Sequence, residues 1–245
     1  MAPLAAAPVD DQEFVVVSRE HRTPVVVELE LAPVAEPMSF LPGQYVLVGD
    51  ADYRVPVRSY SIANAPDVAG RITLLVTTVP EGATSPWLAH EVPVGETLLV
   101  SGPYGSFVAD PDSPTPILCV AGGSGVAPIR ALAEEAVRRG VPVPFTVLFS
   151  GRTEADVIDR DRFTGWAREH ENFTFVRTLT REDGPPPAGR VPEVLPQLQP
   201  DLSGHEVFVA GAPGLVSATV QTVRDLGASP GRLHTEEFYA EPQPW

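Results

Sequence analysis

The chain has 245 residues, a length typical of two compact domains, and 43% of them are hydrophobic. Its net charge is −15, and all 17 basic residues are arginine, because the sequence contains no lysine. A Walker-type phosphate loop and a Schiff-base mechanism both require lysine, so both are excluded. Binding to duplex nucleic acids depends on clustered positive charge, which is not visible here, so we do not expect a nucleic-acid binder.

The single cysteine, Cys119, cannot form an intramolecular disulfide or supply an iron–sulfur cluster or a structural zinc site. The five histidines show no metal-ligand spacing, so we expect no metal. No apolar run reaches the roughly 20 residues of a membrane span. Residues 1–12 are rich in alanine, proline and acid, which predicts a flexible tail and no leader peptide. We therefore expect a soluble, cytoplasmic protein with neither a nucleic-acid partner nor a membrane span.

Six short apolar runs, separated by proline, glycine and aspartate, occupy the chain up to about residue 110. Strands at this spacing are typical of a small antiparallel barrel or sandwich. A short helix is predicted at 85–92, with Ser85 as its N-cap and Pro86 at its first helical position. The six runs are EFVVVSRE, PVVVELEL, GQYVLVG, RSYSIA, RITLLVTTV and ETLLVSG.

The pattern changes after a Pro/Asp linker at 109–116, where apolar strands begin to alternate with amphipathic helices. This alternation predicts a parallel sheet with helices on both faces, as in nucleotide-binding α/β domains. We therefore divide the chain into a barrel domain at 13–110 and an α/β domain at 111–245. The expected strands are PILCVAG, PFTVLFSG, NFTFVRTL and EVFVAG, and the expected helices lie at about 124–140, 159–169, 191–198 and 213–227.

The first of these strands leads through Gly122, Gly123 and Gly125 into a helix that begins near Ala127. Backbone N–H groups and a helix N-terminus converge at such a turn and present about half a positive charge to an anion. Pro128 suits the first helical turn, where its missing N–H has no consequence. A plain tight turn is the alternative, and the strand–turn–helix context favours a pyrophosphate site.

Further motifs stand in a fixed order before and after this turn: RSYS at 58–61, GATSPWL at 82–88, GPYGSF at 102–107 and GGSGVAP at 122–128. With them, the sequence resembles the ferredoxin–NADP⁺ reductase superfamily from about Glu13 to Phe238. The resemblance implies two domains: a six-stranded antiparallel FAD-binding β-barrel with one short helix, then an α/β parallel-sheet NAD(P)-binding domain. GPYGSF is interpreted as structural, with Phe107 near the domain interface.

The resemblance assigns flavin-binding roles to two of these motifs. It implies that Arg58 pairs with the flavin pyrophosphate, that the Tyr60 ring lies against the isoalloxazine, and that the Ser61 hydroxyl reaches the N5 region. Guanidinium groups and aromatic faces suit a phosphate and a flat ring respectively. N–H groups of the second motif would hold the pyrophosphate opposite Arg58. The flavin-binding residues are thus Arg58, Ser59, Tyr60, Ser61, Gly82, Ala83, Thr84 and Ser85.

The second domain would hold the nicotinamide dinucleotide, with its pyrophosphate at the glycine turn. Arg152 and Arg181 follow two successive strands and would hold the adenosine end of the cofactor, which favours NADPH. Glu154 and Asp156 are near enough to keep NADH possible. The dinucleotide-binding residues are thus Gly122, Gly123, Ser124, Gly125, Pro128, Arg152, Arg181, Ala210, Gly211 and Pro213.

The last two motifs lie near the end of the chain. Many relatives have a Cys-Gly-Pro-Pro motif where this sequence has alanine at 210, a residue that also occurs in members that reduce free flavins. Glu236 and Phe238 match, by spacing, an acidic and an aromatic residue that relatives place near the flavin. Tyr239 or Trp245 could instead cover the flavin. The implied catalytic residues are Tyr60, Ser61, Glu236 and Phe238.

The resemblance implies an FAD-dependent NAD(P)H oxidoreductase that passes electrons to a separate acceptor protein, such as a ferredoxin, an oxygenase or a cytochrome P450. No fused haem or iron–sulfur module is expected. Two alternatives stay open: an NAD(P)H:flavin reductase that acts on free flavin, and a non-catalytic redox sensor. The sequence leaves open which acceptor is used, how tightly flavin is bound and which oligomer forms.

Overall fold

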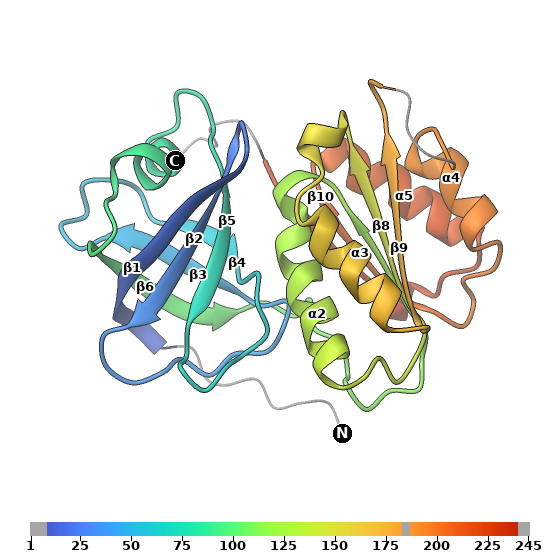
Figure 1. Ribbon diagram of the computed structural model, residues 1–245, viewed down its shortest axis with the longest axis horizontal. Helices are drawn as coiled ribbons and strands as arrows, with labels where there is room; N and C mark the ends of the chain where they lie inside the picture. Colours follow the sequence, from blue (N-terminus) through green and yellow to red (C-terminus); the bar gives the residue numbers. More distant parts are fainter. Residues whose placement is uncertain (1–8, 183–186, 240–245) are drawn as a thin grey trace.

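Six antiparallel strands from the first half of the chain close into a barrel, at the left of Figure 1. A computed structural model describes residues 9–182 and 187–239. The strand order is β4-β3-β6-β1-β2-β5, and an isolated bridge between Ile62 and Leu74 joins the end of β4 to β5 and so closes the sheet. The strands are β1 (Val9–Thr23), β2 (Val26–Pro33), β3 (Tyr45–Asp50), β4 (Arg58–Ser61), β5 (Ile72–Thr77) and β6 (Thr97–Tyr104).

Alternating side chains explain why these runs form a barrel. In β2, Val27, Leu29 and Leu31 point inward and are fully buried, while Glu28 and Glu30 between them are only partly buried. Removing one such aliphatic side chain from water stabilises the fold by about 1.5–3 kcal/mol. All six predicted strands are confirmed, together with the barrel.

The first strand begins earlier than expected. Val9 pairs with Gly102 and Gln12 with Val100, so residues 9–12 belong to β1 and not to a flexible tail. The prediction was wrong there because DDQ has low strand propensity, and its pairing with β6 is decided by tertiary contacts. Residues 1–8 lie outside the described residues.

The predicted helix at 85–92 is present in a different form. A single α-helical turn, α1 (Thr84–Pro86), continues into a π-helical turn at Trp87–Glu91. Ser85 is not the N-cap, since Ala83 precedes the helix and makes no side-chain cap. The Ser85 hydroxyl instead accepts a hydrogen bond from the Val79 N–H at 3.0 Å.

The second half of the chain forms a five-stranded parallel sheet in the order β11-β10-β7-β8-β9. Hydrophobic side chains fill both of its faces, as a parallel sheet requires. Within the described ranges, no helix is long and apolar enough to cross a membrane. The strands are β7 (Ile117–Ala121), β8 (Phe145–Gly151), β9 (Phe173–Leu179), β10 (Glu206–Gly211) and β11 (Leu233–Glu237).

Helices cover the two faces of this sheet in pairs. One core contains Ile129 of α2 and Phe163 of α3, and the other contains Val194 of α4 and Val216 of α5. Figure 1 shows α2 on the side that faces the barrel. The expected helices are confirmed as α2 (Val126–Arg138), α3 (Arg160–Glu169), α4 (Val191–Leu198) and α5 (Pro213–Asp225).

One strand of the sheet was not predicted. LHTEE, which forms β11, has no apolar run, and its side chains are at least partly exposed because it lies at the sheet edge. It pairs in parallel with β10 and brings Ala210 beside Glu236. The strand matters for the site because it brings Glu236 within hydrogen-bond distance of Ser61 in the barrel.

Phe107 lies at the domain boundary, as expected. Its ring meets that of Phe208 of β10 edge to face, with centroids 5.1 Å apart. Such aromatic pairs contribute about 0.5–1.5 kcal/mol beyond the area they bury.

We predict that Gly125→Ala destabilises the α/β domain by about 1–3 kcal/mol. A Cβ at this position would lie 2.4 Å from the Ala210 carbonyl oxygen and 2.6 Å from the Gly211 Cα, and backbone atoms cannot yield as side chains do. Gly165→Ala in α3 is the control. Its Cβ would meet nothing within 4 Å, so it should gain about 0.5–1 kcal/mol from helix propensity. Urea unfolding of both variants measures the difference, and equal effects would contradict the steric argument.

Candidate functional site

A cavity of about 560 Å³ opens where the barrel meets the second domain. Its volume is within the range of about 300–1,000 Å³ that is typical of cofactor sites. Three stretches supply most of its lining: β4, the turn before α1, and the end of β11 with the residues that follow. The lining residues are Tyr45, Arg58, Ser59, Tyr60, Ser61, Leu75, Thr77, Val79, Glu81, Gly82, Ala83, Thr84, Ser85, Ser124, Glu236, Glu237, Phe238 and Tyr239.

All four residues of β4 line the cavity. Arg58 pairs with Val48 and Tyr60 with Val46 in the ladder with β3, so these two side chains point to the same face of the sheet. Tyr60 packs against the barrel core, and burial raises the pKa of its phenol well above the ordinary value. The ladder with β3 ends at Ser61, where the next residue turns to bridge β5.

The turn before α1 and the first residues of α1 line the same cavity, but the hydroxyls of Thr84 and Ser85 bond to neighbouring main-chain groups. Thr84 Oγ1 donates to the Pro56 carbonyl at 2.5 Å, and Ser85 Oγ accepts from the Val79 N–H at 3.0 Å. The first N–H groups of a helix have no partner within the helix. The groups that this turn offers to a ligand are therefore main-chain donors.

Two hydrogen bonds join the domains across the cavity. Ser61 Oγ donates to Glu236 Oε2 at 3.2 Å, and Thr77 Oγ1 donates to Ser124 Oγ at 2.6 Å. Burial raises the pKa of the Glu236 carboxyl from 4.5 to about 7, and the hydrogen bond from Ser61 offsets part of that rise. A carboxyl with a pKa near neutrality can hold or release a proton at physiological pH.

The glycine turn lies beside the cavity and reaches it through Ser124. The Gly122 N–H donates to the Ala210 carbonyl at 3.1 Å, and Gly125 is held against the same strand end. Gly123 has a φ of +57°, and a Cβ there would meet nothing within 4 Å. The turn is thus packed on one side and open on the other. Of the predicted neighbours, Pro128 is in the first turn of α2, and Pro213 begins α5.

The two predicted arginines lie outside the cavity lining, at the ends of β8 and β9. The Arg181 N–H donates to the Arg152 carbonyl at 2.8 Å, so the two loops are joined. The Arg152 guanidinium is bonded to Asp156 at 2.9 Å, and Glu154 is paired with Arg177 at 2.9 Å. Both candidate acidic residues therefore already have arginine partners.

Phe238, which follows β11, lines the cavity, and its N–H donates to the Gly211 carbonyl at 2.9 Å. Tyr239 also lines the cavity and donates its phenol proton to Glu237 at 2.6 Å. Trp245, the other aromatic residue considered above, lies outside the described residues.

Several lining residues were missed by the sequence reasoning. Tyr45 pairs with Ser61 across the β3–β4 ladder, and its ring lies 5.7 Å from that of Tyr104. Thr77 ends β5, and Glu81 is in the turn before α1. Strand register would have located Tyr45, once RSYS was paired with the run that contains it.

The residues present fit a flavin dinucleotide and a nicotinamide dinucleotide. The Arg58 side chain and the start of α1 both line this cavity, and both kinds of group attract phosphate. The open side of Gly123 leaves room for a second phosphate group beside the first turn of α2. Among the described residues, no group of three or more His, Cys, Asp or Glu side chains is placed to hold a metal ion.

Comparison with known proteins finds one family match in each half of the chain. The family described as "Oxidoreductase FAD-binding domain" matches residues 13–108, and "Oxidoreductase NAD-binding domain" matches 119–221. Ferredoxin–NADP reductase B of Sorangium cellulosum is 38% identical over 191 residues, which cover 74% of this chain and 78% of that protein.

Reductases of oxygenase systems are also similar. The ferredoxin–NAD(P)⁺ reductase component of the naphthalene 1,2-dioxygenase/salicylate 5-hydroxylase systems of a Ralstonia species is 33% identical, over 84% of this chain and 62% of that protein. The crystal structure of the Amycolatopsis cytochrome P450 reductase GcoB superposes with a TM-score of 0.86 at 30% identity, over 98% of this chain and 73% of that one. The chain thus spans less than two thirds of the Ralstonia protein.

The raised pKa of Glu236 predicts a pH-dependent stability. The stability that its neutral carboxyl contributes is fully present below about pH 4.5 and is lost as the pH rises through about 7, because the buried group must then ionise. Glu236→Gln removes that ionisation, so its melting temperature should exceed that of the wild type by more at about pH 8 than at about pH 5. Glu237→Gln, on the exposed neighbour, should show no such trend. A difference between Glu236→Gln and wild type that is constant with pH would contradict the assignment.

Proposed function

The chain belongs to the ferredoxin–NADP⁺ reductase superfamily, and on that premise we propose that it is a reductase component that takes electrons from NAD(P)H and delivers them to a separate acceptor protein. The observation that carries the proposal is the cavity between the domains, which gathers RSYS, the turn before α1 and Glu236 in one place. The reductases of oxygenase and cytochrome P450 systems described above support a protein acceptor. Bound FAD supplies the redox chemistry, since it accepts a hydride and releases electrons singly or in pairs.

The residues of the chain bind and orient the two cofactors. We assign the pyrophosphate of FAD to Arg58 and the main chain of the 82–85 turn, and its ring to Tyr60 and Phe238. Ser61 and Glu236 form a hydrogen-bonded pair that can hold a proton beside the ring. The 122–128 turn would hold the pyrophosphate of the dinucleotide, with Ala210, Gly211 and Pro213 behind it.

We place the domain boundary at residues 110–111. The last barrel strand ends at Tyr104 and the first strand of the parallel sheet begins at Ile117. The two family matches end at 108 and begin at 119, which supports a boundary within this linker.

We favour NADPH over NADH as the reductant. A main-chain hydrogen bond joins Arg152 and Arg181, so their two side chains start from neighbouring positions at the carboxyl edge of the sheet. Two guanidinium groups there suit a 2′-phosphate. The pairing of Glu154 with Arg177 and Arg160 removes one acidic candidate for the ribose hydroxyls of NADH.

The first experiment examines the colour of the purified protein and its reaction with NADPH without oxygen. We expect a yellow protein whose absorbance near 450 nm falls on addition of NADPH. A colourless protein that is active only with added FMN or FAD would support the flavin reductase. A yellow protein that neither NADPH nor NADH bleaches would exclude both enzymes and leave the redox sensor.

Arg58→Ala should lower FAD affinity by about 10- to 100-fold, because a charge-assisted hydrogen bond to phosphate is lost. Arg54→Ala is the matched control, since Arg54 pairs with Asp50 at 2.6 Å within the barrel and lies outside the cavity lining. Flavin titration of both variants measures the effect, with circular dichroism as the check on folding. FAD retention by Arg58→Ala equal to that of the control would refute the role given to Arg58.

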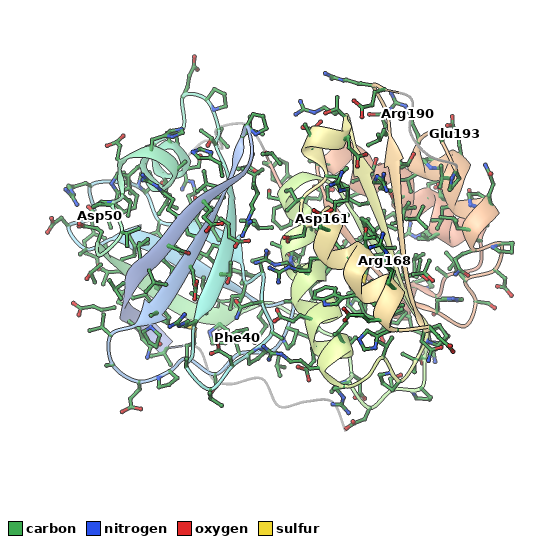
Figure 2. All side chains as sticks on the ribbon, viewed as in Figure 1. Phe40, Asp50, Asp161, Arg168, Arg190 and Glu193 are labelled. Atoms are coloured by element: carbon green, nitrogen blue, oxygen red, sulfur yellow. The ribbon has the colours of Figure 1, made fainter. Side chains whose placement is uncertain are left out.

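Arg181→Gln should lower kcat/KM for NADPH by about tenfold and leave kcat/KM for NADH within about twofold. The reason is that only NADPH carries the phosphate that this guanidinium would contact. Arg168→Gln, on the exposed last turn of α3 (Figure 2), is the control and should change neither value. Equal losses with both dinucleotides would contradict the assignment.

A further inference from the structure

Helix α2 carries three polar side chains at four-residue spacing, Arg130, Glu134 and Arg138, which we call the α2 stripe. Side chains at i, i+4 and i+8 lie along one face of a helix. Helix α2 lies beside the barrel (Figure 1), and the hydrogen bonds of these three side chains show that this face meets it. The stripe therefore stands at the boundary between the two domains.

All three side chains bind main-chain groups of one short segment, residues 63–66. Arg130 Nε donates to the Ala63 carbonyl at 2.5 Å, and Glu134 Oε2 accepts from the Ala65 N–H at 3.0 Å. Arg138 Nη1 donates to the Pro66 carbonyl. Along the stripe a donor, an acceptor and a donor follow one another. They match the carbonyl, the N–H and the carbonyl that the main chain presents at residues 63, 65 and 66.

The segment at 63–66 directly follows β4, the strand of RSYS. It is also fixed to the barrel, because the Ala63 N–H donates to the Thr73 carbonyl at 2.7 Å and Asn64 Oδ1 accepts from the Thr73 N–H at 2.7 Å. Displacement of this segment would therefore displace the end of β4.

Arg130 anchors the stripe more firmly than a surface ion pair could. Its side chain is 2% exposed and bonds to Glu28 of β2 at 2.5 Å and to Asp159, just before α3, at 2.8 Å. Breaking a buried pair leaves an uncompensated charge, which is strongly unfavourable. One guanidinium thus holds both domains.

The same helix begins at the glycine turn, whose Gly125 is its N-cap. The start of α2 packs against the end of β10. Its later turns form hydrogen bonds with the segment that follows β4. We infer that the α2 stripe is a positioning device for hydride transfer, which fixes the dinucleotide turn relative to the flavin strand. This inference rests on the proposed function. Misplacement of two reactants by about 1 Å can lower a rate about a hundredfold, so such a device has a kinetic consequence.

Glu134→Ala tests the inference, because it removes the acceptor of the Ala65 N–H and leaves the buried Arg130 intact. Hydrogen exchange of the Ala65 amide, which loses its acceptor, should become at least about tenfold faster while the sheets of both domains stay protected. Flavin content and KM for NADPH should stay within about twofold, and the rate of flavin bleaching at saturating NADPH should fall about tenfold or more. Glu134→Gln keeps an acceptor oxygen and should restore most of both losses.

Arg54→Gln is the control for a lost ion pair. It breaks the contact with Asp50, which lies on the side of the barrel away from the second domain (Figure 2). It should lower the melting temperature without changing the bleaching rate. A Glu134→Ala protein that is less stable but bleaches at the wild-type rate would overturn the inference. A wild-type protein that neither NADPH nor NADH bleaches would instead refute the proposed function. The hydrogen-exchange result does not depend on bleaching and would still report whether Glu134 holds the Ala65 amide.

Discussion

A buried guanidinium must be neutralised where it is buried, and this requirement on Arg130 governs how the two domains meet. Its partners come from both sides of the boundary: Glu28 and the Ala63 carbonyl from the barrel, and Asp159 from the α/β domain. Separation of the domains would break the Arg130–Glu28 ion pair and the hydrogen bond to the Ala63 carbonyl, and it would leave the guanidinium with Asp159 alone. The cavity depends on this contact, because neither domain lines it alone.

Much of the fold could be predicted because the decisive signals are local. Strands such as PVVVELEL alternate with a period of two, and helices such as 126–138 carry apolar side chains on one face. The failures have tertiary causes. Residues 9–12 and β11 become strands only because β6 and β10 offer them free edges. Ser85 has the sequence pattern of an N-cap, yet its hydroxyl is drawn to the Val79 N–H by the turn that precedes it.

Some parts of the candidate site could be predicted from contiguous motifs, and others depend on the fold. RSYS and the turn before α1 are contiguous motifs, and the structure brings them to one cavity together with Glu236 and Phe238. Tyr45 could not be found without the register of β3 against β4. The α2 stripe was invisible as well, since its partners are main-chain groups, which leave no trace in the choice of side chains.

The use of main-chain partners by the α2 stripe affects how domains of such proteins can be exchanged. A helix that binds a neighbour through carbonyl and amide groups recognises the path of the chain and is indifferent to most of its sequence. Among the hydrogen bonds between the barrel and the α2 stripe in the described part of the chain, the one to Glu28 involves a barrel side chain, and the others involve main-chain groups. At this contact the α/β domain therefore depends more on the backbone of the barrel than on its side chains. A barrel of different sequence grafted onto this α/β domain would have to keep the backbone course at 63–66, one carboxylate in β2 and the hydroxyls of Ser61 and Thr77 that bond to the second domain.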